Sequence, residues 1–456
     1  MSQLEAISPI DGRYYEKLKE LSEYFSEKAL MRYRIMVEIK YLISLSEKEE
    51  VGEVKKMTDE EISHLEDIYH KFSSEDAEKV KKIEKKTNHD VKSIEYFIKE
   101  ELEGTRLGER LEFIHFALTS EDINNLSYTL MLKDFINDLY LPKFLKLISG
   151  LRKLARANKK VAMLSLTHGQ PATPTTLGKE IAVFCYRLQR QYSSLSSLKF
   201  LGKFGGATGN WAAHNVAYPE VDWIEFSKSF VGSLKLEFNP LTTQIENHDS
   251  LIEAYDIIRH INNILIDFDR DMWMYISRKL FKQQNKSGEV GSSAMPHKIN
   301  PIDFENSEGN CGLANAFLQF LSNELTNSRM QRDLTDSTIL RNQGVAMAHS
   351  LLTIKSTVNG LSKVVVDQER IEYELEDHWE VLAEAVQNVL RKLGGEVPYE
   401  KLKELTRGKK ITFKQMEKFI KGLDINEQEK KKLLNLTPQK YTGLSERLVD
   451  KFLNRQ

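Results

Sequence analysis

The sequence predicts an all-α fold, and three observations support this prediction. The 456-residue chain has only 10 prolines, and the long tracts between them are rich in residues that favour helices over strands. Within residues 251–281, apolar side chains recur at steps of three and four, as in a helix packed lengthwise in a bundle. Regular hairpin signals are absent. Because the chain is too long for one compact core, we expect several domains.

Three helical domains are predicted. Residues 1–118 form an N-terminal helical domain, residues 119–366 a central domain of long helices, and residues 367–456 a C-terminal helical domain dense in Lys and Glu. The central bundle begins at Thr119, which has capping-box spacing to Asp122. Its apolar seam is formed by Leu251, Ala254, Ile258, Ile261, Leu265, Phe268, Met272 and Tyr275. A glycine-rich segment, residues 202–209, is predicted to be a loop.

Composition limits the kinds of ligand. The 65 basic and 67 acidic residues nearly balance, which argues against nucleic acid and membrane surfaces as main partners. Two cysteines cannot build a disulfide framework, and no spacing typical of a metal site occurs. No stretch approaches the roughly 20 apolar residues of a membrane span. We expect a cytoplasmic protein that needs no metal or other cofactor.

The most informative segment is residues 288–301, reading G-E-V-G-S-S-A-M-P-H-K-I-N-P. Glycine and proline crowd it, and it follows a long helical run, so it is predicted to be a loop that leaves a rigid element. Ser292 and Ser293 lie in its middle, with Lys298 and Asn300 close behind. Such a loop can carry a base or nucleophile over a bound ligand.

Other polar clusters interrupt the helical pattern. His168 lies between Thr167 and a glycine, where it could transfer a proton near neutral pH or cap a helix. In residues 87–90, Asp90 could hold the imidazole of His89 in one tautomer or cap the next helix. Residues 119–122 could bind an anion at a helix start, although ordinary capping explains them equally well.

Arginines and hydroxyls gather in residues 328–341. Arg332, Ser337 and Arg341 suit a phosphate, because a guanidinium can donate two parallel hydrogen bonds to its oxygens. Ion pairing of the two arginines with Asp333 and Asp336 is the structural alternative. A second basic stretch, residues 405–410, could contact phosphate or form a solvated helix end.

Residues 291–301 resemble the signature loop of the fumarase/aspartase superfamily, whose members cleave C–N or C–O bonds by elimination and release fumarate. Within it, residues 87–90, 119–122, 167–174 and 332–337 resemble the adenylosuccinate lyase family. Residues 8–14 and 398–408 resemble its bacterial members. The likeness covers nearly the whole chain, with no departure at the motif positions.

The resemblance implies a role for each of these residues. Ser292 is the general base and His168 the general acid that protonates the departing nitrogen, although the sequence leaves open how His89 and His168 divide the proton transfers. Lys298 and Asn300 grip the succinyl carboxylate, while Arg332, Ser337 and Arg341 hold the phosphate. The implied substrate-binding set is Arg13, Tyr14, Asn88, His89, Asp90, Thr119, Ser120, Thr167, Gln244, Ser293, Lys298, Asn300, Asn306, Arg332, Ser337 and Arg341.

The resemblance also implies a homotetramer whose central helices form one core and whose active sites draw residues from several chains. The apolar seam fits such a core and would equally suit an intramolecular bundle. Two alternatives stay open. Argininosuccinate lyase shares the signature loop but lacks a phosphorylated substrate, and a non-catalytic helical scaffold would explain the helices without explaining the polar interruptions.

Overall fold

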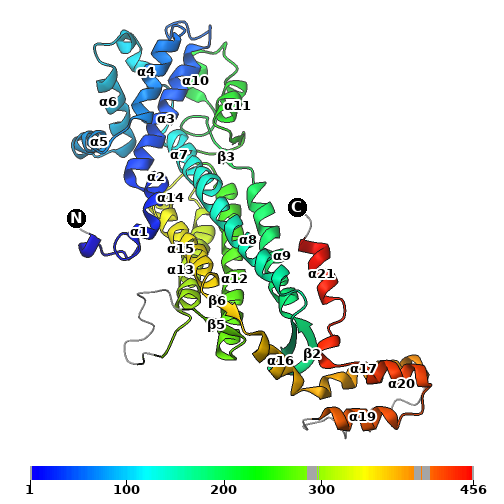
Figure 1. The fold of residues 1–456 in the computed structure, drawn as a ribbon. Coiled ribbons are helices and arrows are strands. Elements are labelled where there is room, and N and C mark those ends of the chain that lie inside the picture. Colours follow the sequence, from blue (N-terminus) through cyan, green and yellow to red (C-terminus); the bar gives the residue numbers. More distant parts are fainter. Residues whose placement is uncertain (1–2, 285–294, 296, 395–401, 403–410, 454–456) are drawn as a thin grey trace. The chain divides into compact units, whose positions relative to one another are not determined.

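The computed structural model describes residues 3–284, 295, 297–394, 402 and 411–453, and helices dominate this part of the chain (Figure 1). The all-α prediction is confirmed. The long helices are α8 (Leu141–Ala157), α9 (Leu177–Ser196), α12 (Asp249–Ser277), α13 (Ile302–Leu325) and α15 (Gln343–Leu361). All eight residues of the predicted seam lie on α12 and are buried.

The chain divides into two compact units. One comprises residues 1–143, 191–263 and 309–353, and the other comprises residues 144–190, 264–308 and 354–456. The five long helices have residues in both units. The division into domains at residues 118 and 366 stays a prediction.

The first unit contains most of the remaining helices. They are α1 (Tyr15–Leu18), α2 (Ser22–Phe25), α3 (Glu27–Ser46), α4 (Asp59–His70), α5 (Ser74–Thr87), α6 (Asp90–Leu102), α7 (Ser120–Asp134), α10 (Ala212–Ala217), α11 (Trp223–Ser233) and α14 (Thr335–Leu340). A short parallel pair, β3 (Leu201–Gly202) and β4 (Glu237–Phe238), accompanies them. Helix α3 packs against α4, α6 and α7 (Figure 1).

Helix α3 begins where the Ser26 hydroxyl accepts a hydrogen bond from the backbone N–H of Ala29, at 3.1 Å. Its apolar residues enter a core that includes an aromatic cluster, in which the Tyr41 ring lies 5.0 Å from Phe204. Two charged residues of the same helix, Arg34 and Glu38, are also buried. Buried charges need partners, so α3 must meet polar side chains from its neighbours.

Helix α7 starts with the predicted capping box between Thr119 and Asp122. Asp122 is fully buried and pairs with Lys203 at 2.8 Å, and it also accepts from the backbone N–H groups of Gly205 and Gly206. The predicted loop at residues 202–209 is thus tied to the start of α7. The close approach at Gly209 excludes any side chain, since a Cβ there would lie 2.5 Å from the Thr242 carbonyl oxygen.

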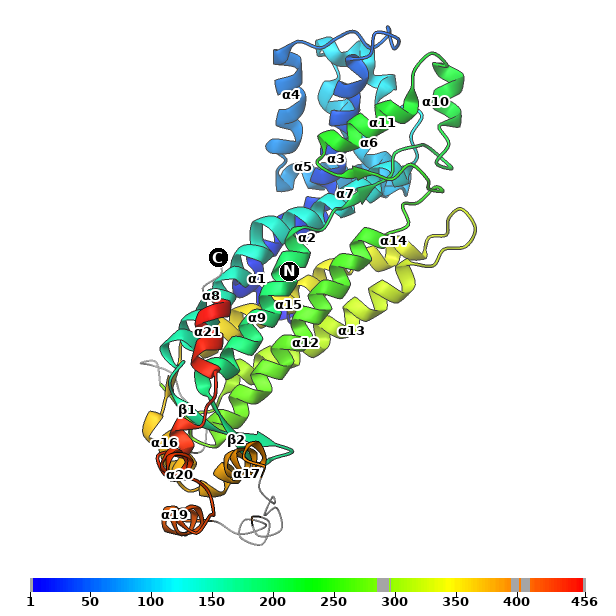
Figure 2. The same ribbon diagram turned by 90° about the vertical axis from the view of Figure 1, so that its right-hand side faces the viewer.

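The second unit contains α16 (Gln368–Glu376), α17 (Ala383–Lys392), α19 (Phe413–Lys421), α20 (Glu427–Leu434) and α21 (Ser445–Leu453). It also holds two antiparallel strand pairs, β1 (Ala162–Thr167) with β2 (Gln170–Thr176) and β5 (Phe281–Gln283) with β6 (Val364–Val366). Apolar residues of the C-terminal helices form a core that includes Leu164 of β1. Strand β1 lies beside α16 (Figure 2). The basic stretch 405–410 lies outside the described residues.

The hairpin β1–β2 corrects the expectation that regular hairpins are absent. Its two turn residues, His168 and Gly169, both have left-handed backbone conformations, with φ of 53° and 72°. That is the geometry of the tightest hairpin turns. Pro171 and Pro174 suggested an interruption rather than a strand, but proline is tolerated in a strand of a two-stranded sheet because one edge needs no ladder partner.

Composition also led to expectations about disulfides, membrane-spanning helices and metal sites. Cys185 and Cys311 are both buried and unbridged. No helix in the described part of the chain combines the length and apolarity required to cross a membrane. Within the same residues, no cluster of three or more His, Cys, Asp or Glu side chains is arranged to hold a metal ion.

Candidate active site

Arg332 is the centre of a polar cluster in the first unit. Its Nη1 donates to Gln244 Oε1 at 3.3 Å, and its Nη2 donates to Ser337 Oγ at 3.2 Å. Nη2 also lies 3.1 Å from Glu121 Oε1. Three predicted site residues, Gln244, Arg332 and Ser337, are therefore in direct contact, although 88 positions separate Gln244 from Arg332.

Glu121 is a buried residue that holds the Arg332 guanidinium through an ion pair. It stands in the first turn of α7, one residue after Ser120, and is only 2% exposed. Burial raises the pKa of the Glu121 carboxyl above its ordinary value, and the positive charge of Arg332 opposes this rise. The predicted residues Thr119 and Ser120 are half-buried at the start of the same helix.

The cluster continues from Glu121 toward α3 and α6. Asn124 Nδ2 donates to Glu121 Oε1 at 2.9 Å, and Arg34 Nε donates to Asn124 Oδ1 at 3.0 Å. Arg34 Nη2 then pairs with Asp90 Oδ2 at 2.7 Å, and the same oxygen lies 3.5 Å from Arg341 Nη2. A continuous chain of polar contacts thus runs from Gln244 to Arg341, and we call it the arginine network.

Asp90 is shared by two guanidinium groups of the arginine network. Burial alone would raise the pKa of Asp90, but the charge and hydrogen bond of Arg34 lower it below its ordinary value. Its other oxygen accepts from the backbone N–H of Val91 at 3.0 Å. One carboxylate therefore faces two cations, which leaves an excess of positive charge beside the more exposed Arg341, whose side chain is 62% exposed.

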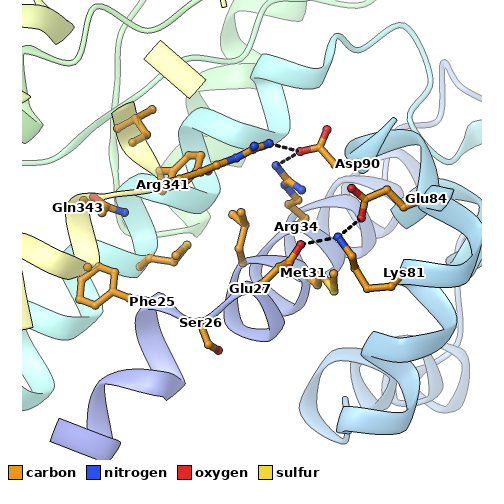
Figure 3. Close-up of a pocket in the computed structure, with 15 residues that line it drawn as sticks. Phe25, Ser26, Glu27, Met31, Arg34, Lys81, Glu84, Asp90, Arg341 and Gln343 are labelled. Carbon is orange, nitrogen blue, oxygen red and sulfur yellow. Dashed lines mark hydrogen bonds and ion pairs between the residues drawn. The ribbon is translucent and has the colours of Figure 1, made fainter. Parts of the chain in front are cut away.

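A pocket of about 370 Å³ opens beside these groups. In Figure 3, Arg34 and Arg341 both point toward Asp90, while Lys81 lies between Glu27 and Glu84. The pocket is lined by Phe25, Ser26, Glu27, Leu30, Met31, Arg34, Lys81, Glu84, Asp90, Tyr128, Met131, Leu340, Arg341, Gln343 and Gly344. Its walls combine apolar side chains with three basic and three acidic ones, and such walls suit an amphipathic ligand.

A second pocket of about 270 Å³ shares Phe25, Ser26, Arg341 and Gly344 with the first. Its wall includes Asp11 and Tyr15, which bracket the predicted residues Arg13 and Tyr14. Arg13 is exposed and Tyr14 is half-buried. The N-terminal segment and Arg341 therefore line one pocket, and the covering role of Arg13 and Tyr14 stays a prediction.

The structure differs from both sequence interpretations of Asp90, since Asp90 neither bonds the His89 imidazole nor caps the next helix. His89 caps α6 through its own ring, because its Nδ1 accepts from the backbone N–H of Lys92 at 3.1 Å. The neutral imidazole therefore carries its proton on Nε2. Asp90 Oδ1 is 4.0 Å from His89 Nδ1, too far for a hydrogen bond. Asn88 precedes this cap in a left-handed conformation, with φ of 52°.

The predicted ion pairs within residues 332–341 differ from those that form. Arg332 pairs with Glu121 and Arg341 with Asp90, both from other helices. Asp333 instead pairs with Arg329 at 3.5 Å. The two arginines are thus held toward α6 and α7 rather than paired with their sequence neighbours.

The second unit carries the other predicted site residues. Thr167 ends β1, and His168 occupies the exposed tip of the hairpin. The predicted helix-capping role of His168 is wrong, because a strand follows it. Ser292 and Ser293 lie outside the described residues.

The described end of the signature loop and the helix after it carry three further predicted residues. Lys298 is exposed, and its backbone N–H donates to the carbonyl oxygen of Met295 at 3.0 Å. Asn300 is half-buried. Asn306 stands on α13, and its Oδ1 accepts from the Ser356 hydroxyl at 2.9 Å.

Sequence reasoning missed three residues of this region. Arg34 and Asn124 complete the arginine network, and His248, which lies close to Asp336, is buried next to it. A cation at position 34, between Tyr33 and Ile35 of α3, was the only local signal for Arg34. Asn124 and His248 gave no signal, because their partners are distant in the sequence.

Solved structures of other proteins share this fold. The chain matches a 3-carboxy-cis,cis-muconate lactonizing enzyme from Pseudomonas putida with a TM-score of 0.75 and 19% identity, covering 97% of this chain and 98% of that one. It matches a fumarate lyase from Mesorhizobium sp. BNC1 with a TM-score of 0.76 and 17% identity, over the same shares of the two chains. Likeness at this level of identity shows the fold alone.

Family models and sequence relatives define the family. Residues 12–315 match the family model described as "Lyase", and residues 328–442 match "Adenylosuccinate lyase C-terminal". The adenylosuccinate lyase of Escherichia coli K12 is 51% identical over 451 residues, and that of Haemophilus influenzae Rd is 50% identical over 452 residues. Each alignment covers 99% of both chains.

The fold and the family models thus define a lyase of the fumarase/aspartase superfamily. More narrowly, the chain belongs to the adenylosuccinate lyase family, and it is an enzyme that cleaves a carbon–nitrogen bond.

Proposed function

We propose that this enzyme splits adenylosuccinate into AMP and fumarate, and that it releases fumarate from the succinylated aminoimidazole carboxamide ribotide by the same elimination. The observation that carries this proposal is the arginine network beside a pocket, in a chain that matches adenylosuccinate lyases along its full length. Both substrates join a succinyl group on nitrogen to a ribose phosphate. The network supplies cations for the anionic end of such a molecule.

The reaction needs a base, an acid and support for developing negative charge. We assign Ser292 as the base that removes the proton from the succinyl carbon β to nitrogen. The electron pair of that C–H bond forms the carbon–carbon double bond, the C–N bond breaks, and His168 donates a proton to the departing nitrogen. Lys298 and Asn300 stabilise the carboxylate on which negative charge accumulates. The exposed tip position of His168 is compatible with this role.

The phosphate is assigned to Arg332, Ser337 and Arg341. Ser337 Oγ accepts from Arg332 Nη2 at 3.2 Å, so the hydroxyl can direct its own proton toward a phosphate oxygen. Buried Glu121 holds the Arg332 guanidinium in one orientation before the ligand arrives. This preorganisation lowers the entropic cost of binding.

The remaining site residues are assigned to three parts of the substrate. The succinyl part contacts Thr119, Ser120, Thr167, Gln244, Ser293 and Asn306; the reacting centre is flanked by Asn88, His89 and Asp90; and the nucleotide is covered by Arg13 and Tyr14. We further propose a cytoplasmic homotetramer with active sites shared between subunits, three helical domains per subunit, and no cofactor.

A spectrophotometric assay tests the reaction. The purified enzyme should convert adenylosuccinate into equal amounts of AMP and fumarate without an added cofactor. Argininosuccinate is the control substrate, because it carries a succinyl group on nitrogen but no phosphate. Cleavage of argininosuccinate without cleavage of adenylosuccinate would sink the proposal.

Arg332→Met tests the phosphate assignment, with Arg329→Met as the matched control. Arg329 is three positions away, and its side chain is 82% exposed. Loss of charged hydrogen bonds should lower kcat/KM by about 100-fold in Arg332→Met and leave the control near wild type. Ser337→Ala retains the Arg332–Glu121 ion pair and should raise KM about tenfold. Equal effects of the Arg332 and Arg329 substitutions would contradict the assignment.

A further inference from the structure

His248 occupies a strained and enclosed position directly before α12. Its φ is 64°, a left-handed conformation that a residue with a side chain rarely adopts, and it is 1% exposed. Its backbone N–H donates to Glu246 Oε2 at 2.7 Å, and its carbonyl oxygen accepts the first helical hydrogen bond, from Ile252 at 3.0 Å. Strain of this kind persists only where the surroundings hold it, and it clusters at functional sites.

The imidazole of His248 faces the carboxylate of Asp336, and the two groups just fail to bond. His248 Nε2 lies 3.7 Å from Asp336 Oδ2. Both atoms are buried, and neither has a hydrogen-bond partner. Shortening the distance between these two atoms by less than about 1 Å would bring it within the usual hydrogen-bond range. A buried donor and a buried acceptor that face each other without bonding are costly, so closing this gap is favourable.

Asp336 connects this gap to the arginine network. Its Oδ1 accepts from the Ser337 backbone N–H at 2.6 Å, and the Ser337 hydroxyl accepts from Arg332. Arg332 in turn donates to Gln244, four residues before His248. The contacts and the intervening chain form a ring that runs from Gln244 through His248, Asp336, Ser337 and Arg332 back to Gln244. Its one open link is the 3.7 Å gap.

The charges of His248 and Asp336 influence the pKa of Glu121, which indicates that this ring lies near Glu121. Burial raises the pKa of the Glu121 carboxyl, and the charge of Arg332 lowers it. The negative charge of Asp336 also raises the pKa of Glu121, and His248 lowers it. The His248–Asp336 pair is therefore near enough to the Arg332–Glu121 pair for the two to respond to each other.

We propose that His248 is a positioning residue that holds Gln244 and Ser337 in register on either side of Arg332. A ligand anion on Arg332 and Ser337 draws the two segments together and closes the His248–Asp336 hydrogen bond, which tightens the grip on that anion. This inference rests on the proposed phosphate role of Arg332 and Ser337. It adds a residue that does not touch the substrate and acts through Asp336.

The test compares His248→Leu, which removes the donor, with His248→Gln, which offers an amide N–H of similar reach. His248→Leu should raise KM for adenylosuccinate about tenfold and weaken AMP binding to a similar extent, with kcat nearly unchanged. His248→Gln should recover most of both losses. His64→Leu is the control, because His64 is an exposed histidine of α4.

AMP affinity is measured by calorimetry on the intact enzyme, so it does not depend on turnover. If wild type does not cleave adenylosuccinate but His248→Leu still weakens AMP binding, the proposed reaction fails and this inference stands. If wild type is active and His248→Leu leaves KM and AMP affinity unchanged, the inference is overturned. A merely structural role would lower the melting temperature without changing KM in the folded enzyme.

Should His248→Leu not fold, His248→Phe, which keeps a ring without the donor, Asp336→Asn and the double variant His248→Phe/Asp336→Asn serve instead. Asp336→Asn keeps the size of the side chain and removes its charge. If the two residues act through one contact, the effects on KM should not add in the double variant. Additive effects would overturn the inference.

Discussion

At the scale of single residues, buried charges are organised in pairs that join distant segments. His115 is an example outside the arginine network: its Nδ1 lies 2.6 Å from Oε1 of Glu38, which is 1% exposed. His115 has a φ of 61° and Ala117 one of 55°, so the chain that leads to Thr119 is strained. The ion pair holds this strained segment against α3.

The His115–Glu38 pair predicts a pH-dependent stability. Burial lowers the pKa of His115, but the Glu38 carboxylate more than compensates and raises it above 6.5. The pair therefore contributes its full stability below about pH 6.5 and loses it as the pH rises through the raised pKa. The melting temperature of wild type should fall more between pH 6 and pH 9 than that of His115→Gln.

His115→Gln should also lower the free energy of unfolding by about 3 kcal/mol at pH 6, because it leaves Glu38 as a buried carboxylate without its cation. His64→Gln, an exposed change, should keep the pH profile of wild type. Parallel profiles for wild type and His115→Gln would contradict the prediction.

At the scale of elements, the hairpin β1–β2 presents the proposed acid. A two-residue turn with both φ angles positive places His168 at the tip, and Gly169 takes the second position at no steric cost. Asparagine tolerates the left-handed conformation better than most residues. It can therefore replace His168 without disturbing the turn.

His168→Asn should lower kcat by about 100- to 10,000-fold, because it removes the proton donor. Its melting temperature should stay close to that of wild type. His168→Val is the comparison: a β-branched residue disfavours a positive φ, so this variant should lose stability as well as activity. Near-normal turnover by His168→Asn would exclude His168 as the acid.

The same elements show what a sequence can and cannot predict. The seam of α12 was predictable residue by residue, because a three-to-four spacing reports one buried helix face directly. The hairpin was missed because its prolines and its His-Gly turn resemble a plain interruption. Arg34 and Asn124 were beyond reach, since their roles depend on Asp90 and Glu121, which only the tertiary fold brings to them.

At the scale of the whole molecule, the residues assigned to the active site are divided between the two compact units. The arginine network belongs to the first unit, and the hairpin histidine and signature loop belong to the second. The proposed tetramer would allow different subunits to supply these parts. Exposed apolar side chains on the long helices, such as Trp273 and Phe320, are compatible with burial between subunits.

Mixing two inactive variants tests whether subunits share sites. His168→Asn and Ser292→Ala chains, each inactive alone, are unfolded together and refolded as hybrids. If one site takes His168 and Ser292 from different chains, hybrids contain some sites with both groups intact, and up to about a quarter of wild-type activity should return. Hybrids of Ser292→Ala with wild-type chains control for refolding yield. No recovery would argue against shared sites.

The double use of Asp90 has a consequence for how such chains can diverge. One carboxylate balances Arg34 inside the protein and Arg341 toward the pocket. Loss of Asp90 by mutation would leave Arg34 buried without a counter-charge, which lowers stability. Reversion, or a second change at position 34, would restore that stability. Positions 34 and 90 are therefore expected to change together over evolution, whereas the residue at position 341 is expected to be constrained by ligand binding.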